Sequence, residues 1–144
     1  MKKYSNLITF FFLTIFSIAV SANSSDKLDT RISLNMTEPE KNEFLSEMRQ
    51  MLVSIQGIMM GIGTEDRDLI IRSARYSGNR MARKTPQSLR QKLPASFKEL
   101  GGPTHMMFEE LVIRAETDDM ATLSEFTGEL MHQCLSCHDM FKVN

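Results

Sequence analysis

Two closely spaced cysteines near the C-terminus constrain this chain more than any other feature. Cys134 and Cys137 are the only cysteines in 144 residues, and His138 follows directly. The string Cys-x-x-Cys-His is the spacing of covalent haem attachment. Two thiols at this spacing can bond to the two vinyl groups on one porphyrin edge, and the adjacent imidazole then binds the iron axially. The spacing predicts one haem c per chain, attached through Cys134 and Cys137 and ligated by His138.

Two other uses of a cysteine pair compete with haem attachment. A thioredoxin-like redox pair requires a strand-to-helix context, and the sequence shows no strand pattern there. A zinc site requires two further ligands at similar spacing, and only His105 and His132 remain as histidines outside the motif. Haem attachment is therefore the favoured interpretation.

The N-terminus has the pattern of an export signal. Lys2 and Lys3 precede a mostly apolar run over residues 7–20, and small residues end it at Ala22. The run is short for a membrane anchor, which is the competing interpretation. We expect residues 1–22 to be a cleaved signal peptide and the mature protein to be periplasmic, with no stable membrane span after processing.

Charge and composition narrow the partners. Without residues 1–22, fifteen basic side chains face eighteen acidic ones, and no long basic run indicates nucleic-acid binding. The basic residues between Arg67 and Lys98 are interpreted as a solvated helix face. The chain has twelve methionines and no tryptophan, and flexible methionines adapt to irregular partners such as a macrocycle.

Helical periodicity begins after a polar stretch. We expect residues 23–36 to be a flexible lead-in and residues 37–144 to form one domain. Thr37-Glu38-Pro39-Glu40 predicts the start of a first helix that ends near Gly63. Apolar residues then recur at steps of three and four on one predicted face: Phe44, Met48, Met51, Leu52, Ile55, Met59 and Ile62.

Three further amphipathic helices are expected. The second begins after residues 64–66 and is weakened at Gly78-Asn79, and a short helix covers residues 87–93. Gly101-Gly102-Pro103 predicts a loop, Thr104 caps a third helix, and the fourth begins after Asp119 and carries the cysteine motif. This pattern predicts an all-α protein: a four-helix antiparallel bundle with one covalently bound haem between its helices.

A haem motif near the C-terminus of such a chain resembles the class II cytochromes, which are the cytochrome c′ family and its low-spin relatives. Residues 93–97, Leu-Pro-Ala-Ser-Phe, look like a family motif before the third helix, and Phe141-Lys142 looks like the family's ending. Met48-Arg49-Gln50 resembles the stretch where Arg and Gln approach the haem propionates. The resemblance thus implies that Arg49 and Gln50 bind the cofactor, and it makes a homodimer a candidate assembly.

The sequence allows several candidates for the sixth iron ligand. In the resembled family an apolar side chain or a methionine of the first helix covers the distal face. The Arg49-Gln50 alignment puts Val53 there, which cannot bind iron. Met48 is the favoured ligand because it lies on the apolar stripe near the helix start; Met51, His105 or no protein ligand are the alternatives.

Two functions follow from the alternatives. A filled sixth position favours an electron-transfer protein, because haem ligation and burial set a potential and no side chain suggests bond-making chemistry. An open position favours binding of a small gas such as nitric oxide. A haem enzyme with peroxidase-like activity is less favoured, because only His105 could serve as its distal acid–base. We expect no enzymatic activity, and the sequence does not identify redox partners.

Overall fold

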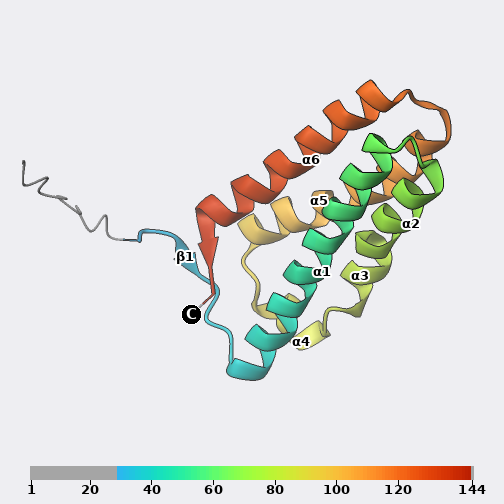
Figure 1. Cartoon of the computed structure of the whole chain (residues 1–144). Coiled ribbons are helices and arrows are strands. Elements are labelled where there is room, and N and C mark those ends of the chain that lie inside the picture. Colours follow the sequence, from blue (N-terminus) through green and yellow to red (C-terminus); the bar gives the residue numbers. More distant parts are fainter. Residues whose placement is uncertain (1–28, 144) are drawn as a thin grey trace, which may run out of the picture.

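The computed structural model describes residues 29–143, and Figure 1 shows how their elements are arranged. The expected signal peptide at residues 1–22 lies outside the described residues. Helices dominate the described part, which confirms the all-α class. The elements are β1 (Ile32–Ser33), α1 (Glu38–Gly63), α2 (Arg67–Ser77), α3 (Asn79–Lys84), α4 (Gln87–Lys92), α5 (Ala95–Thr117), α6 (Met120–Met140) and β2 (Phe141–Lys142).

The longer helices contact one another in a closed order. α1 packs along α2, α2 along α5, and α5 along α6, while α6 also touches α1 less extensively. In Figure 1, α6 runs across the top of the molecule and α1 lies beside α2. No helix within residues 29–143 is both long enough and apolar enough to cross a membrane.

α1 and α2 approach closely because small residues face each other. A Cβ on Gly57 would collide with the Ser73 hydroxyl, and one on Gly61 would collide with Ile70. The buried Ser77 hydroxyl donates to Ser54 Oγ at 2.7 Å, so both hydroxyls keep a partner where water is excluded. This side of α1 is therefore committed to α2.

The starts of α1, α2 and α6 follow the predicted signals. Glu40 Oε2 accepts hydrogen bonds from the N–H and the hydroxyl of Thr37, each at 2.8 Å, at the start of α1. Asp66 and Asp119 accept hydrogen bonds from backbone N–H groups at the starts of α2 and α6. The weak point at Gly78 separates α2 from α3, as expected.

The loop predicted at residues 101–103 is wrong. α5 begins at Ala95 and continues through Gly101, Gly102 and Pro103 to Thr117. Pro103 lacks an N–H, and glycine costs roughly 1 kcal/mol in a helix. Packing outweighs these losses: side chains on both sides of the Gly-Gly-Pro stretch lie in the core, and the Thr104 hydroxyl donates to the Leu100 carbonyl at 2.8 Å.

The apolar stripe predicted on α1 is right in part. Phe44 and Met51 are buried, but Leu52 is 68% exposed and Met59 is 46% exposed. The buried face is turned toward α2 by the close approach at Ser54 and Gly57, so residues on the far side of the predicted stripe lose contact with the core.

The segment before α1 packs on the helices, which the sequence analysis did not predict. β1 pairs in parallel with β2, with Ile32 opposite Phe141, and the Leu34 N–H donates to the Lys142 carbonyl at 3.0 Å. Leu34 and Met36 are buried. The described residues 29–36 therefore tie the start of the domain to the end of α6.

This tie makes a prediction for stability. Leu34→Ala removes a buried side chain and should lower the free energy of unfolding by about 2 to 4 kcal/mol. Ile32→Ala removes a side chain that is 49% exposed on the same segment and should cost less than about 1 kcal/mol. Urea unfolding followed by circular dichroism measures both. Equal, small losses would show that the segment does not pack on the domain in solution.

A second prediction concerns Glu40 and the pH dependence of stability. Hydrogen bonds from Lys92 and from Thr37 lower the pKa of Glu40 to about 2, well below the ordinary value of a glutamate carboxyl. A carboxylate whose pKa is lower in the folded state stabilises the fold at pH values above its unfolded-state pKa. This stabilisation is lost as the pH falls through the folded-state pKa. Between pH 5 and about pH 2, the wild type should lose more stability than Glu40→Gln, measured by urea unfolding at several pH values. Parallel pH profiles would contradict this assignment.

Candidate functional site

The core is divided into two clusters that meet partway along the long helices. The large cluster lies between α1, α2, α5 and α6, and its buried members are Met51, Ile58, Ile70, Ala74, Met81, Phe108, Leu111, Val112, Ala115, Leu123, Phe126 and Leu130. The small cluster lies around the β1–β2 pair and α4, and its buried members are Leu34, Met36, Phe44, Leu89, Leu93 and Phe141.

The cysteines follow Leu130, the last residue of α6 in the large cluster, and Cys137 packs against the small cluster. The inward-facing residues of α6 and β2 recur at steps of three and four, and they are Leu123, Thr127, Leu130, Cys134, Cys137 and Phe141. Those up to Leu130 have no exposed surface, and Phe141 is 5% exposed. Cys134 and Cys137 between them are only half-buried. The inward-facing row of side chains is therefore buried before and after the two cysteines and is partly exposed at the cysteines themselves.

On the neighbouring helices α1 and α5, the two clusters also join partway along the helix. On α1, Met48 is half-buried and packs against both clusters. On α5, Leu100 packs on the small cluster and Phe108 lies in the large one, while Gly101 and Thr104 stand between them. Small side chains on α5, a flexible methionine on α1 and the two thiols on α6 therefore share the level where the clusters join.

His138 lies at the exposed edge of this line. It is exposed, and its backbone carbonyl accepts a hydrogen bond from Arg31 at 3.3 Å, which ties the segment before β1 to the end of α6. Met131 and Leu135 precede His138 at helical spacing on the same face and are 44% and 61% exposed. Solvent-exposed apolar side chains therefore flank the histidine.

The environment of the thiols does not suit redox catalysis. Burial raises the pKa of Cys134, and burial together with Cys134 raises the pKa of Cys137. Reactive cysteine pairs depend on lowered pKa values, for example at a helix N-terminus, whereas this motif lies in the last turns of α6. The thioredoxin-like interpretation therefore has no support in this geometry.

A zinc site finds no support either. Within residues 29–143, no three His, Cys, Asp or Glu side chains come close enough together to hold a metal ion. His132 is exposed on α6, and His105 Nδ1 donates to the Ser77 carbonyl at 2.7 Å, which holds His105 toward α2. A metal bound through a macrocycle does not need such a cluster.

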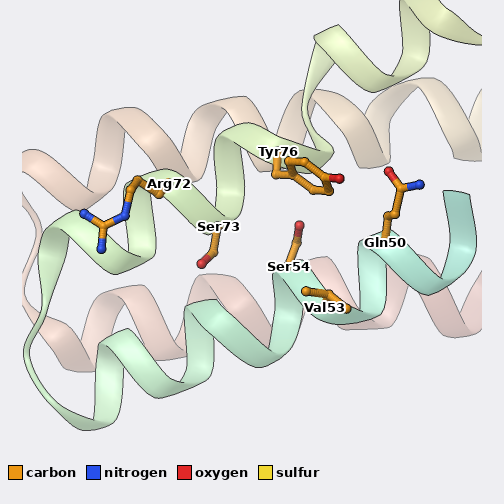
Figure 2. Close-up of a pocket in the computed structure, with 6 residues that line it drawn as sticks. All are labelled: Gln50, Val53, Ser54, Arg72, Ser73 and Tyr76. Carbon is orange, nitrogen blue, oxygen red and sulfur yellow. The ribbon is translucent and has the colours of Figure 1, made fainter.

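Arg49 and Gln50 are not brought to the cysteines. Arg49 is exposed, and Gln50 is half-buried and lines a groove between α1 and α2 together with Val53, as Figure 2 shows. Val53 is 62% exposed. Met51 is buried in the large cluster, whereas Met48 and Cys137 both pack against the small cluster. Of the α1 candidates, Met48 is the one at the level of the cysteines.

Residues that border the cysteine side were missed by the sequence analysis. Leu34 and Met36 cover the small cluster that Cys137 joins. Their signal was the alternation of Ile32, Leu34 and Met36 with polar residues, a period of two that is typical of a strand. It extends over too few residues to be distinguished from chance.

Comparison with known proteins adds no relative: no family model, no curated protein and no solved structure matches the chain significantly.

Proposed function

We propose that this protein is an exported mono-haem c-type cytochrome that transfers electrons. The observation that carries the proposal is the break in burial along α6: the thiols of the Cys-x-x-Cys-His motif lie where an otherwise buried line of side chains opens. A covalently attached, flat apolar group suits that position, because it would cover the half-exposed side chains at the join of the two clusters.

The residues at this level fit a haem c. Cys134 and Cys137 would carry the thioether bonds, and His138 would be the proximal ligand. The haem would supply an iron that alternates between two oxidation states. The chain's own contribution is to exclude water with the apolar side chains of both clusters and to provide axial ligands, and both help to set the reduction potential.

Met48 is the best-supported sixth ligand. It is half-buried and packs against both clusters, so its long thioether side chain lies at the join. His105 is held toward α2 by its hydrogen bond to Ser77, and Met51 is fixed within the large cluster. Thioether ligation raises the potential and fills the coordination site, which suits electron transfer rather than gas binding.

The wider arrangement supports the same class. The closed order of helix contacts, α1–α2–α5–α6, supports the four-helix bundle that we propose, and such bundles hold cofactors between facing helices. The basic and apolar pattern of residues 1–22 supports periplasmic export, where haem c attachment takes place. Arg49 and Gln50 could contact propionates only if α1 rotated from its present packing on α2.

The attachment prediction uses a matched pair of variants. Cys134→Ala with Cys137→Ala removes both thioether bonds, so protein denatured and run on a gel should lose its haem stain completely. Ser136→Ala changes the same turn of α6 without touching a thiol and should keep the stain. Wild-type haem that extracts into acidic organic solvent would contradict covalent attachment.

The ligand prediction compares two methionines. The ferric wild type should show the weak red-region absorption band of thioether-ligated haem, and Met48→Ala should lose the band and bind carbon monoxide when reduced. Met51→Ala should keep the band, since Met51 lies in the large cluster. If the wild type lacks the band and binds carbon monoxide at once, the iron is open and the gas-binding alternative replaces electron transfer.

A further inference from the structure

A groove lies on the surface of α1 that faces α2 and α3, away from the cysteine line. It consists of two adjoining hollows of about 360 Å³ each. They share Gln50, Arg72 and Tyr76, so they form one continuous depression. Figure 2 shows one of the two hollows, to which α1 contributes Gln50, Val53 and Ser54 and α2 contributes Arg72, Ser73 and Tyr76.

One edge of the groove is strongly basic. Arg72, Arg75, Arg80 and Lys84 line it along α2 and α3, and all four are exposed. Within the described residues none of them takes part in an ion pair. The segment 67–98 carries nine basic side chains and one acidic one, although the whole chain has a net charge of −1. Positive charge exceeds negative charge in the groove, since four cationic side chains line it together with the two carboxylates of Glu43 and Glu47.

The composition of the groove resembles that of a protein interface. Val53 and Tyr76 line the groove and are 62% and 58% exposed. Tyrosine and arginine are the residues most often found at the energetic centre of protein interfaces, where an apolar middle is bordered by polar groups. A purely solvated face, which the sequence predicted for these arginines, does not explain why they line a groove together with Val53 and Tyr76.

We propose that this groove is a docking surface for an acidic segment of a partner protein. Arginine binds carboxylates through two parallel hydrogen bonds. Arg72 and Arg75 lie on α2, whereas Arg80 and Lys84 lie on α3 beyond the break at Gly78. Several carboxylates of an extended segment can match cationic groups spread over two helices, and one small anion cannot. Glu43 and Glu47 line the opposite edge on α1, so they direct an acidic segment toward α2 and α3.

The test uses the purified protein and a dye-labelled peptide of six glutamates flanking one central leucine, with fluorescence anisotropy as the readout. The acidic peptide should bind, its affinity should fall as salt is added, and the lysine counterpart should not bind. The proposal does not depend on the haem, so loss of peptide binding would leave the proposed function untouched.

Matched charge reversals locate the site. Arg72→Glu with Arg75→Glu should weaken peptide binding at least tenfold. Arg90→Glu with Lys98→Glu makes the same change in net charge at exposed positions outside the groove and should weaken binding less than threefold. Tyr76→Ala should weaken binding while leaving net charge unchanged. All substituted residues are exposed, and circular dichroism checks that each variant stays folded.

Three outcomes would overturn the proposal. Equal losses in the two charge-reversal pairs would show attraction by overall charge without a site. Binding to phosphatidylglycerol vesicles with no binding of the acidic peptide would make the basic edge a membrane contact. A dimer in sedimentation velocity that dissociates in Arg72→Glu with Arg75→Glu would show that a second copy of this chain occupies the groove.

Discussion

The structure depends on the packing of the inward-facing side chains of α6 against the neighbouring helices. This helix is covered by α5 and α1 along its first half, where Leu123, Thr127 and Leu130 have no exposed surface. The cover opens at Cys134 and Cys137 and closes again at Phe141, which β1 holds through parallel pairing. Met48 packs against both clusters, and the thiols stay half-exposed on α6 between Leu130 and Phe141. The proposed covalently attached haem would cover these half-exposed side chains.

The second constraint acts on the other side of α1. Close packing of Gly57 and Gly61 on α2 fixes the rotation of α1, which turns Met48 toward the cluster join and leaves Val53 in the outer groove. One helix therefore serves two surfaces: an inner one at the level of the cysteines and an outer one bordered by the arginines of α2 and α3. The two proposals concern separate faces and can fail separately.

The sequence predicted those features whose causes are local. Thr37, Asp66 and Asp119 mark helix starts because their side chains or near neighbours bond the first free N–H groups. It failed where distant contacts decide. Gly101-Gly102-Pro103 has the composition of a loop, yet packing keeps it helical. The rotation of α1, the burial of Leu34 and the groove all depend on neighbours distant in sequence.

The central claim is that the haem lies at the join of the two clusters, and its ring current gives the most direct test. In a carbon–proton NMR spectrum of the reduced protein, the methyl signals of Met48 and Thr104 should be shifted furthest from the ordinary chemical shifts of such methyl groups. Both residues lie at the level where the two clusters join. Methyl groups of Leu69 and Ile71 on α2 should change little. Large displacements at Met131 and Leu135 with none at Met48 would place the haem on the outer face of α6 and contradict the account.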